Sequence, residues 1–176
     1  MTVEALRRGE PAVLAELLER HGREIQGVAY LILRDRAEAE DVLMDTLLSA
    51  LDRGTSLRDP AALRAWLLRI ATNHALGRRR RAARVLHVAI APEIPVLDAD
   101  ATDHFALMTA IDALPVRTRA AVILHYYADL SVADVSRTLG TSPNTVKTQL
   151  RQALERLRLA LADEGEARAL PEVAHG

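Results

Sequence analysis

Six polar side chains of one predicted helix have the composition of a DNA-binding surface. All six are uncharged or basic, and no carboxylate stands among them before Glu155. They are Thr145, Lys147, Thr148, Gln149, Arg151 and Gln152. An ordinary solvated helix face carries charges of both signs, whereas a set of donors without carboxylates suits a phosphate-lined groove. We interpret this face as one that reads DNA.

Two predicted helices within residues 130–158 position this face. Ser131 predicts an N-cap, with Asp134 at the third helical position as in a capping box. Gly140 predicts the end of the first helix, and Ser142 followed by Pro143 predicts the start of the second. Apolar residues recur at helical spacing: Leu130, Val135, Leu139, Val146, Leu150, Leu154 and Leu157. The pattern predicts a helix-turn-helix, with an ordinary helical hairpin as the alternative.

A second basic group ends a predicted helix that begins near Asp59-Pro60. It comprises Arg78, Arg79, Arg80, Arg81 and Arg84. Before it, Arg69, Asn73 and His74 are expected to point outward, while Trp66 falls on the apolar stripe and is expected in the core. Such an arginine run favours phosphate contact, although it also occurs as a solvated helix end.

An acidic helix is predicted over residues 37–51. Its outer side carries Glu38, Glu40, Asp41 and Asp45. Carboxylates near a helix N-terminus suit the helix dipole, and a docking face for a basic partner is the functional interpretation. A metal or general acid–base site is not favoured, because no histidine or second carboxylate cluster accompanies them.

Composition narrows the class of protein further. The 176 residues include no cysteine, so neither a disulfide framework nor a thiolate zinc site is expected. Strand-like alternation is scarce and aromatic residues make up only 3% of the chain, which favours an all-α fold. We found no signal peptide, membrane span, Gly-rich phosphate loop or nucleophile elbow, so we expect a cytoplasmic protein without enzymatic activity, metal or cofactor.

The charge distribution predicts two small helical domains. No lysine or arginine occurs within residues 85–116, whereas five carboxylates do, and Pro92 and Pro95 interrupt helix formation. We expect an N-terminal domain over residues 1–84, an acidic flexible linker over 85–103, a helix-turn-helix domain over 104–163 and a disordered tail over 164–176. Within the first domain, Gly22 and Gly27 weaken the prediction of a continuous helix.

Four motifs resemble, in order and spacing, those of the extracytoplasmic-function (ECF) sigma factors of bacterial RNA polymerase. They are Ala39-Glu40-Asp41-Val42, residues 64–73, Ala113-Leu114-Pro115 and residues 130–157. The resemblance implies a sigma region 2 domain followed by a sigma region 4 domain. It also implies core RNA polymerase, through its β and β′ subunits, promoter DNA and an anti-sigma factor as partners, without membrane insertion.

Site residues follow from the same resemblance. Glu40, Asp41 and Asp45 would bind the clamp helices of the β′ subunit. Asn73 would lie near the pocket for a flipped base of the −10 element. The other expected −10 contacts are Arg69, His74, Arg78 and Arg80. The six polar residues of the last helix would read the −35 element.

Two other classes of protein remain as alternatives. A stand-alone helix-turn-helix regulator would bind specific DNA without polymerase. A sigma-like interaction protein would bind its partner without reading promoters.

Overall fold

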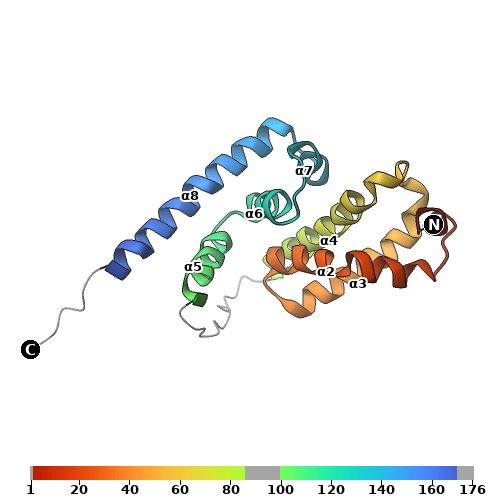
Figure 1. Ribbon diagram of the computed structural model, residues 1–176, viewed down its shortest axis with the longest axis horizontal. Coiled ribbons are helices and arrows are strands. Elements are labelled where there is room, and N and C mark those ends of the chain that lie inside the picture. Colours follow the sequence, from red (N-terminus) through yellow and green to blue (C-terminus); the bar gives the residue numbers. More distant parts are fainter. Residues whose placement is uncertain (1, 86–99, 170–176) are drawn as a thin grey trace, which may run out of the picture.

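The protein consists of helices and short connections, without a strand, in residues 2–85 and 100–169, the part that the computed structural model describes (Figure 1). In chain order the N-terminal module contains α1 (Thr2–Arg7), α2 (Val13–Leu33), α3 (Arg36–Arg53), the 3₁₀ turns η1 (Gly54–Ser56) and η2 (Pro60–Ala62), and α4 (Leu63–Val85). The C-terminal module contains α5 (Asp100–Asp112), α6 (Val116–Val122), the π-helical turn η3 (Ile123–Tyr127), α7 (Val132–Leu139) and α8 (Pro143–Ala169).

This architecture confirms the predicted all-α fold with two helical domains. Most of the predicted linker lies outside the described residues, as do residues 170–176 of the predicted tail. The domain boundaries therefore stay predictions. Helix α8 continues to Ala169, which is further than the tail prediction allowed. No helix of the described part is long and apolar enough to cross a membrane.

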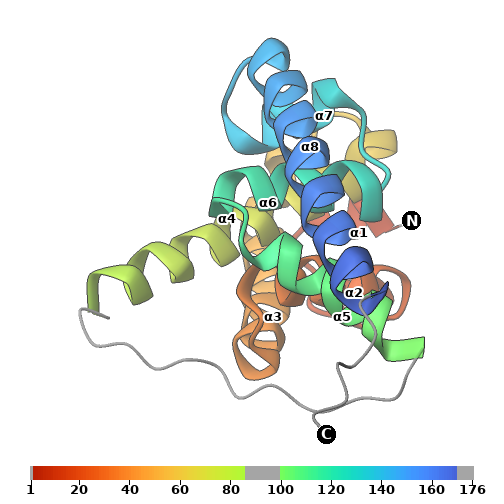
Figure 2. The same cartoon turned by 90° about the vertical axis from the view of Figure 1, so that its left-hand side faces the viewer.

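In the N-terminal module, α2, α3 and α4 pack against one another around a shared apolar core. Helix α2 runs unbroken through Gly22 and Gly27, so the expected interruption does not occur. Glycine at position 27 allows a close approach between the modules, because a Cβ there would overlap with the Tyr127 hydroxyl of the other module. In Figure 2, the C-terminal half of α4 projects away from the other helices.

The helix-turn-helix forms as its sequence predicts. The Ser131 hydroxyl accepts from the Asp134 backbone N–H at 3.1 Å, and Ser142 caps α8 in the same way through Thr145 at 3.1 Å. Gly140 adopts the left-handed conformation, with φ of 60°, that a residue without Cβ reaches at least cost. The helices therefore begin after Ser131 and Ser142, and the first of them ends at Gly140, as the sequence predicted.

The side chain of Tyr127 is 53% exposed, although it follows a run of buried residues on the same segment. The cause lies in η3, where the Ala128 N–H bonds to the Ile123 carbonyl five residues earlier, at 3.0 Å. This wider turn shifts the following side chains around the helix axis relative to an α-helix.

Candidate nucleic-acid interface

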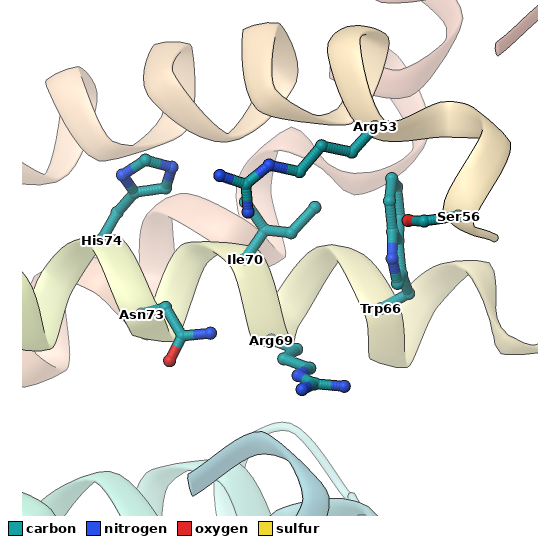
Figure 3. A pocket seen from close by; sticks show the side chains of 7 residues that line it. All are labelled: Arg53, Ser56, Trp66, Arg69, Ile70, Asn73 and His74. Carbon is teal, nitrogen blue, oxygen red and sulfur yellow. The ribbon is translucent and has the colours of Figure 1, made fainter. Parts of the chain in front are cut away.

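A pocket of about 550 Å³ opens where the end of α3 meets the middle of α4 (Figure 3). Pockets that hold small ligands usually measure about 300–1,000 Å³, so this one is large enough for a single nucleobase. Its lining residues are Arg53, Ser56, Trp66, Arg69, Ile70, Asn73 and His74. Guanidinium, hydroxyl, amide and indole groups therefore converge on one cavity.

The connection between α3 and α4 builds one wall of this pocket. Arg53 is the last residue of α3, and Ser56 follows in η1. The intervening Gly54 packs directly against α1, where a Cβ would overlap with the carbonyl oxygen of Leu6. A larger residue at position 54 would displace this backbone, so the close packing on α1 holds Arg53 and Ser56 beside α4.

Helix α4 builds the opposite wall with side chains that recur about one turn apart. Trp66 is only partly buried and lines the pocket, although its place on the apolar stripe predicted a core residue. Figure 3 shows that Asn73 and Arg69 point away from α3, whereas His74 points toward it. The structure thus brings together three predicted contacts, Arg69, Asn73 and His74.

His74 contributes to this site in its neutral form. Its Nε2 lies 3.0 Å from the Ser49 hydroxyl on α3. Burial lowers the pKa of His74, and the attraction of Asp45 opposes this shift only in part. A histidine pKa below the usual value of about 6.5 leaves the ring uncharged at neutral pH. His74 therefore acts here as a hydrogen-bonding group that ties α4 to α3.

Sequence reasoning missed Arg53 and Ser56 as members of the pocket. Both lie in the α3–α4 connection, outside any helical periodicity that α4 could reveal. Trp66 carried a usable signal, because it precedes Asn73 by about two helical turns and so shares its side of α4.

Arg78 occupies a different environment from its arginine neighbours. Its guanidinium lies 2.7 Å from Glu38, 3.2 Å from Asp41 and 2.8 Å from Asp45, all on α3. The hydrogen bonds that Arg78 donates to these carboxylates raise the pKa of Arg78 above its ordinary value, and the bond to Asp45 has the largest effect. One predicted DNA contact and two predicted polymerase contacts therefore form a single ion-pair cluster.

The three arginines that follow Arg78 are free to contact a phosphate. Arg79, Arg80 and Arg81 are exposed on the projecting end of α4 and have no ion-pair partner among the described residues. Of the two arginines predicted at this end to contact the −10 element, Arg80 is thus the free cation and Arg78 the paired one.

Glu40 lies apart from the cluster around Arg78. Its Oε1 lies 3.3 Å from Arg36 Nε and 3.5 Å from Gln26 Nε2. Between Glu40 and the pair Asp41 and Asp45, the surface of α3 presents Met44 and Leu48, which are 54% and 53% exposed. We call these five residues the α3 surface. Met44 and Leu48 were not among the predicted site residues. Their four-residue spacing outside the core stripe could have indicated an exposed apolar patch on this helix.

The predicted reading face of α8 is accessible. Thr145, Lys147, Thr148, Arg151 and Gln152 are exposed, and Gln149 is partly buried. The opposite side is anchored by buried Val146, Leu150 and Leu157. The helix therefore presents its donors on one side, and no carboxylate interrupts them.

Both modules match known protein families. Residues 17–85 match Sigma-70 region 2, and residues 104–157 match Sigma-70, region 4. The chain is 36% identical over 151 residues to the ECF RNA polymerase sigma factor SigM of Mycobacterium tuberculosis, covering 85% of this chain and 77% of the relative. This chain belongs to the ECF sigma factors. As a sigma factor it directs RNA polymerase to promoters and catalyses no reaction itself.

Further relatives agree with this assignment. The sigma factor SigL of M. tuberculosis is 32% identical over 168 residues, which cover 90% of this sigma factor and 94% of SigL. The structure is similar to that of the sigma factor RpoE in complex with the anti-sigma factor NepR from Bartonella quintana. The TM-score is 0.68 at 25% identity, over 84% of this chain and 96% of RpoE. CnrH in complex with the cytosolic domain of CnrY shares the fold, with a TM-score of 0.68 at 23% identity, over 92% of this chain and 96% of CnrH.

Proposed function

We propose that this sigma factor reads the −10 element of its promoters through the pocket between α3 and α4. The observation that carries this proposal is the convergence of Arg53, Ser56 and Asn73 beside the Trp66 indole. Side-chain amide and hydroxyl groups hydrogen-bond to the edges of an unstacked base, and an aromatic ring or guanidinium plane packs against its face. Asn73 would recognise the edge of one extruded base of the non-template strand.

Phosphate contacts would come from the surrounding arginines. Arg69 lines the pocket on the side away from α3, and Arg80 stands free on the projecting end of α4. Because guanidinium groups pair with phosphates without reading sequence, these residues would hold the opened strand in register while Asn73 discriminates the base. His74 would support Asn73 through its bond to Ser49.

The −35 element would be read by α8 in the major groove. Its exposed donors match the requirements of a recognition helix, whose first turns contact base edges and phosphates. Lys147 and Arg151 would contact phosphates, and the neighbouring threonine and glutamine side chains would contribute hydrogen bonds.

Core RNA polymerase would bind to the α3 surface. Exposed Met44 and Leu48 form an apolar centre with carboxylates on both sides. An interface with an apolar centre and a charged rim binds a partner of opposite charge, here the basic clamp helices of the β′ subunit. Arg78 would keep Asp41 and Asp45 in place on this surface rather than contact DNA.

Regulation by an anti-sigma factor is part of the proposal. The solved structures of RpoE and CnrH hold a second protein, and their similarity to this chain extends over both modules. We place the protein in the cytoplasm, where the polymerase acts. We also retain the division into residues 1–84, a linker over 85–103, and residues 104–163.

In vitro transcription with core polymerase and a promoter library tests the function. Promoter-specific products should require this protein, and sequencing them yields both promoter elements. The same assay with Asn73→Ala should relax base preference at one position of the non-template −10 strand. Losing a good base contact costs about 1–3 kcal/mol of discrimination, or about 5- to 150-fold.

The remaining promoter positions provide the internal control, since contacts with them do not involve Asn73. An equal loss at every position would contradict the assignment of Asn73 to one base. Absence of specific products throughout the library would contradict promoter direction by this chain and favour the sigma-like interaction protein.

A further inference from the structure

A second cavity, of about 530 Å³, lies between α7 and the segment that joins α3 to α4. Its size falls within the range of about 300–1,000 Å³ that is usual for small-molecule pockets. The polar and aromatic residues that line it come from both modules: Arg58, Trp66 and Arg69 on one side, Asp134, Arg137 and Thr138 on the other. The residues of α7 and Arg58 have no part in the proposed function.

The wall at the α3–α4 connection has a fixed backbone. Leu57 is buried, and Arg7 of α1 donates to the carbonyls of Leu57 and Arg58 at 2.7 and 2.9 Å. Asp59 accepts a hydrogen bond from the Ala61 N–H at 2.9 Å. These contacts hold the backbone on both sides of the Arg58 side chain, which is exposed and lines the cavity.

The opposite wall is formed by the outer side of α7. Asp134 accepts a hydrogen bond from the Ser131 hydroxyl and forms an ion pair with Arg137. The bond from Ser131 is the main cause that lowers the pKa of Asp134, so its carboxylate stays charged at neutral pH. One guanidinium nitrogen of Arg137 contacts Asp134, which leaves other N–H donors of this side chain for a ligand.

A direct contact between the modules sets the distance between these walls. Arg64, in the first turn of α4, donates to the Ala128 carbonyl at 2.6 Å, and Ala128 lies shortly before α7. Figure 3 shows Arg69 pointing away from α3, and this residue lines the same cavity as Arg137. The two modules therefore bring three arginines to one cavity.

The unpaired charge in this cavity is positive. Among the described residues, neither Arg58 nor Arg69 has an ion-pair partner. Both nearby carboxylates, Asp59 and Asp134, already accept hydrogen bonds from their own modules. Guanidinium groups bind phosphate oxygens through paired N–H donors, so a phosphate-bearing ligand suits this lining.

Trp66 adds a second chemical preference. Its indole is partly buried, and its N–H forms no hydrogen bond within the part of the chain that the structure describes. An aromatic ring beside cationic side chains binds a nucleotide by stacking on the base and pairing with the phosphates. The combination favours a nucleotide over an inorganic anion.

We propose that this cavity binds a nucleoside diphosphate or triphosphate. The base stacks on Trp66, and Arg58, Arg69 and Arg137 contact the phosphates. The ligand thus touches both modules, and its affinity depends on α7 as well as on α4. This inference goes beyond the proposed function and does not depend on promoter reading.

Trp66 is itself the reporter for the test, because the chain contains no other tryptophan. Titration of the full chain with GDP and with ADP should quench its fluorescence in a saturable way, since a stacked base quenches indole emission. Free tryptophan titrated in parallel corrects for light absorbed by the nucleotide. Isothermal titration calorimetry gives the dissociation constant and the stoichiometry, which should be one nucleotide per chain.

Two variants test the two walls separately. Arg58→Gln and Arg137→Gln should each weaken nucleotide binding by about three- to tenfold, because each removes a charge-assisted hydrogen bond to a phosphate. Arg156→Gln is the matched control, since Arg156 is exposed on α8 and does not line the cavity. Its affinity should equal that of the wild type. Circular dichroism melting shows whether each variant has folded.

Inorganic pyrophosphate separates nucleotide binding from binding of an anion alone. It should bind more weakly than GDP or ADP and leave Trp66 emission unchanged. Equal affinity for pyrophosphate and both nucleotides would overturn the proposal, as would absence of saturable quenching by either nucleotide. Unchanged affinity in folded Arg137→Gln would also overturn it, because the nucleotide would then lie in the −10 pocket alone. Persistence of promoter-specific transcription in these cases would leave the proposed function intact.

Discussion

At the scale of single residues, Arg78 shows how a charged side chain changes its role with its surroundings. Arg79, Arg80 and Arg81 follow it directly, yet among these four described arginines only Arg78 forms ion pairs with α3, where it meets Glu38, Asp41 and Asp45. Its side chain is 20% exposed, whereas the carboxylates remain more accessible. Arg78 thereby offsets the mutual repulsion of three carboxylates on one helix face.

Replacing Arg78 by glutamine should therefore destabilise the N-terminal module. Each carboxylate is more than 40% exposed, so water screens the pairs, and we expect a loss of about 1 kcal/mol in the free energy of unfolding. Urea denaturation at low and high salt measures this loss, which should shrink as salt screens the repulsion. The matched control is Arg79→Gln, which should stay within about 0.5 kcal/mol of the wild type. Equal effects of the two variants would show that the cluster contributes nothing to stability.

At the scale of elements, α8 combines a structural and a reading function on opposite sides. Val146, Leu150 and Leu157 bury one side against α5, α6 and α7. The N-cap at Ser142 sets where the helix begins and thus which side chains lie in its first turns. Rotation of α8 about its axis would expose the apolar side, so core packing determines which residues face the groove.

The double variant Lys147→Ala and Arg151→Ala should weaken promoter binding by the holoenzyme. Each lost phosphate contact lowers the slope of log affinity against log salt concentration by about 1, so the slope should fall by about 2. Binding of promoter duplex across a salt series measures it. Arg156→Ala removes an exposed arginine of the same helix that lies beyond the six reading residues, after Glu155, and should leave the slope unchanged. An unchanged slope in the double variant would mean that α8 does not contact phosphates through these residues.

At the scale of the whole molecule, each DNA-reading module has few contacts to offer alone. A handful of basic side chains gives non-specific affinities in the range of about 10⁻⁴–10⁻⁶ M. Two weak sites held at the correct separation reinforce each other through effective concentration. We expect the polymerase to hold the two modules at that separation.

The free protein should accordingly bind a complete promoter duplex only weakly. We expect a dissociation constant of about 10⁻⁴–10⁻⁶ M without polymerase, and binding at least about 100-fold tighter by the holoenzyme. Fluorescence anisotropy with the same duplex measures both. Nanomolar, sequence-specific binding by the free chain would contradict this expectation and favour a stand-alone regulator.

The amino-acid sequence alone determined the helices of this protein and the chemistry of their faces. Helical periodicity predicted the apolar stripes, and Ser131, Gly140 and Ser142 marked helix ends that the structure confirms. Such signals act between residues three or four apart, so they can be read along the chain. The donor-rich face of α8 followed from composition in the same way.

Only the tertiary structure decided which distant residues meet. Arg78 and Glu38 are 40 positions apart, and their contact depends on how α4 crosses α3. The pocket wall at Arg53 and Ser56, the exposure of Tyr127 and the approach of α6 to Ile32 likewise arise from packing between elements. Residue spacing carries no signal for such contacts, because the crossing of two helices is set by the whole core that they share.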